Sequence, residues 1–304
     1  MKIILLVISL SYLVACGQGE YEDAIPNNVM QEKVGINLEA AEKTRANLLA
    51  GILEAQNDEA KDRFQYRHPG ETLDFMGIQP GMTVVEALPG GGWYSKILAP
   101  YLSKEGQLIG VDYSIDMWPH FDFGTPEFIE KRKKWADEWP TEAKAWAGDE
   151  GAAVSAFTFG SLPYTLNNSV DAVLFVRSLH NIARFEEDGG FFSAALQGTY
   201  RVLKKDGVVG VVQHAANEDK SDEWANGSNG YLKKSAVITQ FENAGFKLLK
   251  ESSLNENPKD QPGEEDIVWR LPPSYATSQD NEILKSEYAA IGESNRMTLL
   301  FRKK

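Results

Sequence analysis

Residues 80–96, PGMTVVEALPGGGWYSK, place the strongest constraint on how this chain can fold. The β-branched and apolar run 83–88 has the composition of a strand that is buried on both faces. Pro89 and the glycines at 90–92 end this run, and apolar residues at helical spacing follow from Trp93 to Leu102. A strand, a glycine loop and a helix in this order are typical of the first half of a nucleotide-binding βαβ unit.

The glycines suit a loop whose backbone contacts a ligand. Without a Cβ atom, the backbone can approach a molecule at the helix N-terminus, where free N–H groups point outward. A second predicted strand, 107–111 (QLIGV), ends at Asp112, 20 residues beyond Gly92. A carboxylate there can accept hydrogen bonds from both hydroxyls of a ribose. Together these features predict a ligand that contains adenosine; a tight turn without a ligand is the alternative.

The first fifteen residues read as a signal peptide. Lys2 precedes an uncharged run, 3–15, that is too short to span a membrane as a mature helix. The run closes in Leu-Val-Ala-Cys16, which resembles the lipobox of bacterial lipoproteins. That resemblance implies cleavage before Cys16 and attachment of diacylglycerol to its sulfur. Cys16 is the single cysteine of the chain, so no internal disulfide is expected. An ordinary signal peptide with an incidental cysteine is the alternative.

The resemblance to lipoproteins also implies a location. We expect an exported protein, held in the cell envelope at the periplasmic face by the lipid on Cys16, with no other membrane contact. Gly17 after the cysteine resembles lipoproteins that are sorted outward to the outer membrane. The net charge of −13 disfavours phosphate backbones, so nucleic acid is not an expected partner. A small molecule or an envelope component is the expected substrate.

The order of predicted elements defines the domains. Residues 16–36 are polar without a period and predict a tether, and residues 37–79 predict an N-terminal helical extension. Residues 80–304 predict one α/β domain, because strands alternate with helices to the end of the chain. The further predicted strands are 154–158, 170–178, 208–213, 246–251 and 297–301, and the helices between them are 191–204, 234–244 and 281–291. This pattern predicts a Rossmann-like, mostly parallel seven-stranded sheet with helices on both faces.

Residues 117–151 form an insertion after Asp112. It contains a basic helical segment, EFIEKRKKWADEW, and the tryptophans Trp118, Trp135, Trp139 and Trp146. A lid or a substrate platform is one interpretation. The other is that the aromatic side chains anchor an amphipathic insertion to the main domain.

With this order in place, the chain resembles class I S-adenosylmethionine-dependent methyltransferases. The strings that carry the likeness are VVEALPGGGWY, GVDYS, SLPY, SVDAVLFVRSLHNI, YRVLKKDGVVGVV and ENAGFKLLK. More narrowly, YRHPGETLDF, NENPKD, LPPSY and AIGESNRMTLLF resemble a bacterial family of predicted exported (lipoprotein) methyltransferases. The likeness runs from about residue 60 to residue 304.

The resemblance implies S-adenosylmethionine as the cofactor. It places the cofactor contacts at Glu86, Pro89, Gly90, Gly91, Gly92, Tyr94, Asp112, Thr158 and Phe159. The chain departs from the family pattern at two points. Leu88 stands at the first glycine position of the loop. Thr158 or Phe159 stands where many relatives carry an acid for the adenine amino group.

Candidate catalytic residues follow the fourth and fifth strands. His180 lies just past the fourth strand and His214 directly after the fifth, so both are expected at the edge that holds the glycine loop. If the acceptor must lose a proton during methyl transfer, a neutral histidine suits the role of base at pH 7. We therefore predict His180 as the base, with Arg177 and Asn181 orienting the substrate. Weaker candidates for the same pocket are Tyr94, Arg67, His214 and Tyr231.

Three other functions remain open at the level of sequence. The first is a methyltransferase fold that binds an adenosyl or other small ligand without transfer. The second is a metal site formed by His68, His180, His214 and Glu218, although no dense histidine spacing supports it and no metal is expected. The third is a nicotinamide oxidoreductase, whose loop would normally keep the glycine that Leu88 replaces.

Overall fold

The structure, a computed structural model, describes the backbone of residues 27–304 and the side chains of residues 39–304. The predicted signal peptide 1–15 and the predicted lipidation site Cys16 lie outside the described residues. In chain order the helices and strands are α1 (Asn27–Glu54), α2 (Asp58–Lys61), α3 (Phe64–Arg67), α4 (Pro69–Phe75), β1 (Thr83–Ala87), α5 (Ser95–Tyr101), β2 (Gln107–Asp112), η1 (Ile115–His120), α6 (Pro126–Arg132), α7 (Trp135–Ala147), β3 (Ala153–Thr158), η2 (Tyr164–Leu166), β4 (Val170–Val176), α8 (Leu179–Ala183), α9 (Glu186–Gly189), α10 (Phe191–Val202), β5 (Leu203–Ala216), β6 (Leu232–Lys233), α11 (Lys234–Asn243), β7 (Phe246–Ser252), η3 (Val268–Arg270), α12 (Glu282–Ile291) and β8 (Arg296–Lys303).

Helix α1 corrects the predicted tether. The helix begins at Asn27, so residues 27–36 are helical where an aperiodic tether was expected. These residues contain no proline, and a helix needs no apolar periodicity when propensity is sufficient. The chain divides into two units, which meet between Thr44 and Arg45 in the sequence, and the sheet belongs to the unit from Arg45 to Lys304. From residue 27 onward, no helix combines the length and the apolar character that crossing a membrane requires.

The sheet has the strand order β3-β2-β1-β4-β5-β8-β7, with the short β6 paired to β5. Strands β1 to β5 run parallel to their neighbours along this order, whereas β8 is antiparallel to both β5 and β7. This arrangement confirms the predicted α/β class and its seven-stranded sheet. The two-residue strand β6 was not predicted, since a strand this short leaves no period in the sequence.

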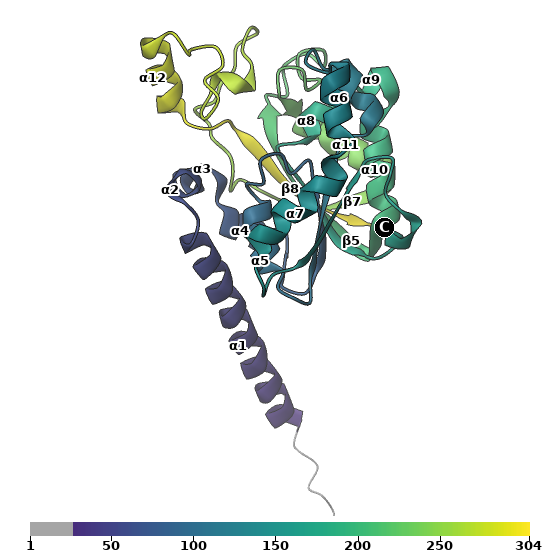
Figure 1. Ribbon diagram of the computed structural model, residues 1–304. Helices are drawn as coiled ribbons and strands as arrows, with labels where there is room; N and C mark the ends of the chain where they lie inside the picture. The colour runs from purple at the N-terminus through teal and green to yellow at the C-terminus, as the bar shows by residue number, and fades with distance from the viewer. Residues whose placement is uncertain (1–26) are drawn as a thin grey trace, which may run out of the picture. The chain divides into compact units, whose positions relative to one another are not determined.

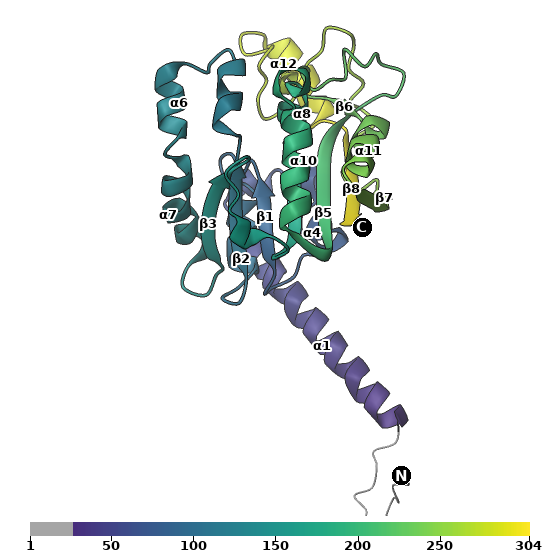
Figure 2. The same cartoon turned by 90° about the vertical axis from the view of Figure 1, so that its right-hand side faces the viewer.

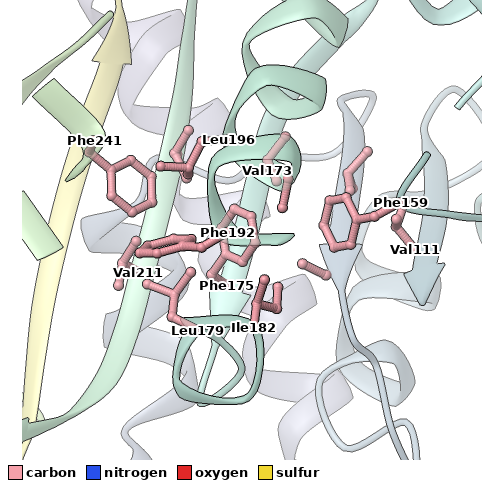
Figure 3. Close-up of a cluster of buried hydrophobic side chains, with 14 of the residues drawn as sticks. Val111, Phe159, Val173, Phe175, Leu179, Ile182, Phe192, Leu196, Val211 and Phe241 are labelled. Carbon is pink, nitrogen blue, oxygen red and sulfur yellow. The ribbon is translucent and has the colours of Figure 1, made fainter. Parts of the chain in front are cut away.

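Helices lie on both faces of the sheet (Figures 1 and 2), and alternating strand residues pack against them. Val85 and Phe175 belong to the cluster under α8, α10 and α11, which Figure 3 shows in close-up. Val84 and Leu174 belong to the cluster under α4, α5 and α7 on the other face. A fully buried side chain of this size contributes about 1.5–3 kcal/mol, so the two clusters hold the sheet rigidly between helical layers.

Strand β1 lies between β2 and β4, and the chain leaves it toward β2 first and reaches β4 later. This is the switch point of the sheet, where the connections run to opposite sides and a crevice opens beyond the carboxyl ends of the strands. The segment 253–295, between β7 and β8, supplies further residues at this edge. It is anchored by the buried pair Asp260 and Arg270, whose carboxylate and guanidinium lie 2.7 Å apart.

Candidate functional site

A cavity of about 320 Å³ lies at the carboxyl ends of β1, β4 and β5. The glycine loop forms one wall, the turn after β4 another, and the segments 268–274 and 293–294 complete the lining. The predicted site residues that line this cavity are Glu86, Pro89, Gly90, Gly91, Tyr94, Arg177, His180, Asn181 and His214. The topology therefore brings most of the predicted site into one place.

The glycine loop presents its backbone to the cavity. Gly90 and Gly92 have φ angles of 55° and 76°, in the left-handed region that favours glycine. Leu88 has φ 56° at the position where the family pattern has a glycine, so this loop keeps the left-handed turn with a leucine. A Cβ atom on Gly91 would meet nothing within 4 Å, which leaves the backbone there open to a ligand.

Glu86 is the last residue but one of β1 and is buried, with 5% of its surface exposed. Its carboxylate accepts a hydrogen bond from the Ser95 hydroxyl at 2.6 Å. Burial raises the pKa of Glu86 to about 8, and the bonds from Ser95 offset only part of this effect. Glu86 is therefore mostly uncharged at pH 7, and it can donate a proton to a ligand in the cavity.

Gln213 fixes the tautomer of His180. The Gln213 amide nitrogen donates to the carbonyl oxygens of Gly230 at 3.0 Å and His214 at 3.3 Å, so its oxygen must face His180. That oxygen lies 3.2 Å from His180 Nδ1, which therefore carries the proton. His180 Nε2 is left as an acceptor, and the ring lines the cavity. This is the arrangement that a general base requires.

Both histidines of the cavity are uncharged at neutral pH. Burial lowers the pKa of His180 to about 4, and nearby Arg177 and Arg184 add to this effect while the bond to Gln213 opposes it. Burial also lowers the pKa of His214, whose Nδ1 lies 2.5 Å from the Ser294 hydroxyl. The two ring centroids are 5.2 Å apart. His180 is thus neutral, as predicted from the sequence, although its basicity in the free protein is low.

The ribose acid lies outside the cavity. Asp112 ends β2 and is buried, and its carboxylate pairs with the Arg132 guanidinium from α6. Burial raises the pKa of Asp112, and the charge of Arg132 offsets part of the rise. The Arg132 guanidinium lies 4.9 Å from the ring centroid of Trp118 and 5.6 Å from that of Trp135. Asp112 is therefore already paired within the protein.

The other tryptophans of the insertion pack against glycines of the main domain. A Cβ atom on Gly92 would lie 2.3 Å from the Trp146 ring, and one on Gly110 would lie 2.9 Å from Trp139. Gly92 is consequently covered by Trp146 and does not line the cavity. These contacts favour the interpretation that the aromatic residues anchor the insertion.

Several sequence candidates lie elsewhere. Thr158 exchanges hydrogen bonds with Ser161, and Phe159 packs on Phe175 with ring centroids 6.2 Å apart. The Tyr231 hydroxyl donates to Asp260 and accepts from Arg270 in a buried cluster. His68 lines a separate cavity of about 180 Å³. Arg67 pairs with Glu293, which does line the main cavity.

The described residues contain no group of three or more His, Cys, Asp or Glu side chains that could hold a metal ion. His180 and His214 are close to each other, but His68 lies at the other cavity. Residues 39–304 therefore give no geometric support to the hypothesis of a metal site built on these histidines.

Sequence reasoning missed one wall of the cavity. Trp269, Pro272, Glu293 and Ser294 line it and come from the segment between β7 and β8. The Trp269 ring centroid lies 5.7 Å from that of His180. The signal for Pro272, Glu293 and Ser294 is that they fall within the family-like strings LPPSY and AIGESNRMTLLF, whereas Trp269 lies outside both.

The residues present fit S-adenosylmethionine at the loop. Gly90 and Gly91 offer open backbone at the N-terminal side of α5, and Glu86 and His180 supply polar atoms beside it. At the other end, Asp112 is the acid that a ribose requires, but its carboxylate is bound to Arg132. An adenosyl ligand that binds both oxygens of Asp112 has to displace Arg132 from Oδ2.

No protein-family model matches the chain, and no curated protein matches it. Among solved structures, the [4+2]-cyclase SpnF is similar with a TM-score of 0.47 and 16% identity, over 78% of this chain and 80% of that chain. A SAM-dependent methyltransferase from Aquifex aeolicus has a TM-score of 0.43 and 14% identity, over 84% and 98%. An arsenic(III) S-adenosylmethionine methyltransferase from Chlamydomonas reinhardtii has a TM-score of 0.43 and 14% identity, over 84% and 73%.

The strand order decides the class of fold. Five parallel strands with a switch point beside β1, followed by an antiparallel β8 inserted between β5 and β7, are typical of class I methyltransferases. The chain is thus a methyltransferase-fold protein whose cavity lies at the switch point.

Proposed function

We propose that this protein is an S-adenosylmethionine-dependent methyltransferase that acts on a small molecule or an envelope component. The observation that carries the proposal is the cavity itself, which has the open glycine loop on one wall and the turn of Arg177, His180 and Asn181 on the other. When bound, the cofactor would supply an electrophilic methyl group to an acceptor that attacks in line.

The residues of this chain would position the acceptor and take its proton. His180 Nε2 accepts the proton that the acceptor loses, because Gln213 holds the proton of the ring on Nδ1. Arg177 and Asn181, on the same turn, orient the acceptor. The segment with Trp269 and Pro272 limits the access of water to the reacting atoms.

The Arg132–Asp112 pair favours a second candidate function. A methyltransferase-fold protein that keeps its ribose acid paired internally can bind a small ligand in the cavity without methyl transfer. Calorimetry of the purified protein tests for binding of the cofactor, with S-adenosylmethionine, S-adenosylhomocysteine, NAD and zinc as separate titrants. Binding of the two adenosyl compounds supports the first proposal; binding of NAD or zinc alone contradicts it.

Catalysis is tested by transfer of a tritium-labelled methyl group from S-adenosylmethionine to a cell-envelope extract. Loss of a general base typically lowers the rate by about 10²–10⁴. His180→Asn should therefore lose label transfer and keep the affinity for S-adenosylhomocysteine, since an asparagine hydrogen-bonds but does not take the proton. Transfer at the wild-type rate in this variant would show that His180 is structural.

We also propose that the protein is exported and lipid-anchored through Cys16, on the strength of the Leu-Val-Ala-Cys sequence and the absence of any other cysteine. Labelled palmitate should enter the wild-type protein in bacterial cells and not the Cys16→Ala variant. Equal labelling of both proteins contradicts the proposal.

A further inference from the structure

Three arginines surround the inner end of the cavity. Arg67 and Arg296 are buried and share one counterion, Glu293, with nitrogen–oxygen distances of 2.8 Å and 3.0 Å. Arg177 has no carboxylate within 4 Å among the described residues, and its Nε atom is buried without a hydrogen-bond partner. The positive charge of Arg177 therefore remains uncompensated, although its side chain lines the cavity.

The backbone holds Arg177 in an unusual conformation. Its φ angle is 55°, in the left-handed region, and its N–H donates to the Val212 carbonyl at 2.6 Å. A non-glycine residue in this region costs about 1–3 kcal/mol and persists where the surrounding structure enforces it. Such strain, directly beyond the carboxyl end of β4, is typical of a residue that is held for binding.

The remaining charges of the cavity do not balance the arginines. Glu86 is mostly uncharged at pH 7, because burial raises its pKa to about 8. His180 and His214 are neutral, and the carboxylate of Glu293 already pairs with Arg63, Arg67 and Arg296, which leaves Arg177 without a carboxylate of its own. Arg67 and Arg296 are buried and Arg177 is half-buried, in a chain whose net charge is −13. A buried charge without a counterion is costly, and a bound anion relieves that cost.

An adjoining cavity extends the positive charge toward the surface. It has a volume of about 280 Å³ and shares Gly91, Trp93 and Pro273 with the main cavity. Its lining includes three cations, Arg63, Arg67 and Lys96, and one carboxylate, Glu59. Clustered cations of this kind raise the local concentration of an anion and speed its entry.

We propose that Arg177 binds an anionic group, a carboxylate or a phosphate, of the molecule that accepts the methyl group. The assignment to the acceptor rests on the proposed function and on the turn after β4, where Arg177 precedes His180 by three residues and both line the cavity. The planar fork of a guanidinium matches either anion with two parallel hydrogen bonds. An acceptor held by its anionic end at Arg177 has its neighbouring atoms beside His180 Nε2.

The first test measures thermal stability and calorimetric binding with inorganic phosphate and acetate, at constant ionic strength with chloride as reference. The wild-type protein should be stabilised by at least one of these anions, and Arg177→Gln should lower its affinity by about tenfold or more. Arg302→Gln is the matched control, because it removes the same charge from an exposed side chain of β8 and should keep the anion response. Equal responses in the wild type and Arg177→Gln would overturn the proposal. Arg177→Lys, which keeps a point charge and should bind weakly, replaces the glutamine variant if that variant misfolds.

The second test distinguishes the acceptor from the amino-acid carboxylate of the cofactor. If the acceptor supplies the anion, the response to phosphate or acetate persists when S-adenosylhomocysteine is saturating. Two results together would assign Arg177 to the cofactor and overturn the proposal. The first is loss of the anion response when S-adenosylhomocysteine is saturating. The second is an Arg177→Gln variant that binds S-adenosylhomocysteine more weakly but binds methylthioadenosine normally. An anion response that depends on Arg177, in a protein that binds no adenosyl compound, would refute the proposed methyltransferase function and leave the anion site in place.

Discussion

Replacing Arg132 should strengthen the binding of an adenosyl ligand. Arg132→Met keeps an unbranched apolar stem beside Trp118 and Trp135 and removes the charge that pairs with Asp112. A hydrogen bond to a charged group contributes about 1.5–3 kcal/mol, which a ribose must otherwise displace. Since about 1.4 kcal/mol corresponds to a factor of ten, the affinity for S-adenosylhomocysteine should rise by about tenfold to a hundredfold.

The assay is calorimetry on a double-mutant cycle with Asp112→Ala. In the Arg132→Met background, Asp112→Ala should weaken binding by about tenfold or more, because both ribose hydroxyls lose their acceptor. In the wild-type background the loss should be smaller, because there the ligand already has to displace Arg132. Without ligand, Arg132→Met should be less stable than the wild type, since it leaves a buried carboxylate without its partner.

Arg302→Met serves as the control for the loss of one positive charge on an exposed strand residue. Unchanged or weaker binding in Arg132→Met would refute the reasoning, since it would show that Arg132 does not compete with the ligand. Equal effects of Asp112→Ala in both backgrounds would show that the two side chains act independently.

Three further substitutions test the buried acid and the loop. The folded protein keeps Glu86 protonated up to a pH of about 8, whereas the unfolded chain releases this proton near pH 4.5. The free energy of unfolding should therefore fall as the pH rises through this range. Urea titrations at pH 5 and pH 8 measure this decline, and Glu86→Gln should reduce it by on the order of 3 kcal/mol. A slope identical to that of the wild type would contradict the burial of this acid. Gly92→Ala should lower the melting temperature, because the φ angle of Gly92 is 76° and a Cβ atom there would meet the Trp146 ring. Gly91→Ala should change the free energy of unfolding by no more than about 0.5 kcal/mol and should weaken the binding of S-adenosylhomocysteine. A Gly91→Ala protein that is less stable than the Gly92→Ala protein would show that the glycine loop does not have the geometry described above.

Local sequence rules predict one half of the site because its parts follow single strands. The run 83–88 and its glycines define β1 and the loop, and His180 follows β4 within a few residues. The carboxyl ends of parallel strands share one edge of the sheet, so the meeting of the loop with His180 follows from topology alone. The same rule placed Arg177 and His214 correctly.

The other half depends on contacts between distant segments. The Arg67–Glu293 pair joins residues that are 226 positions apart, and no sequence pattern in either segment predicts this contact. The pairing of Arg132 with Asp112 likewise depends on the packing of α7, whose Trp139 and Trp146 contact the sheet and the glycine loop. The periodicity of the sequence does not predict these contacts. The expectation that Asp112 is free for a ribose was reasonable from its strand position alone, and the packing of the insertion is what pairs it.

The charges around His180 link acceptor binding to proton transfer. Burial, together with the charges of Arg177 and Arg184, lowers the pKa of His180 to about 4, so the free protein holds a neutral but weak base. An anion at Arg177 cancels one of these positive charges and favours the protonated imidazole, which raises the pKa of His180. The base would thus gain strength only when the acceptor is in place.

This link is measurable by nuclear magnetic resonance titration of the His180 ring. Saturating phosphate should raise the pKa of His180 in the wild type. In Arg177→Gln the pKa should already be higher without phosphate and should no longer respond to it, because the repelling charge and the anion site are lost together. Arg302→Gln should behave like the wild type. If the protein binds phosphate and the pKa of His180 does not change, the anion lies away from the base, and Arg177 has no role in proton transfer.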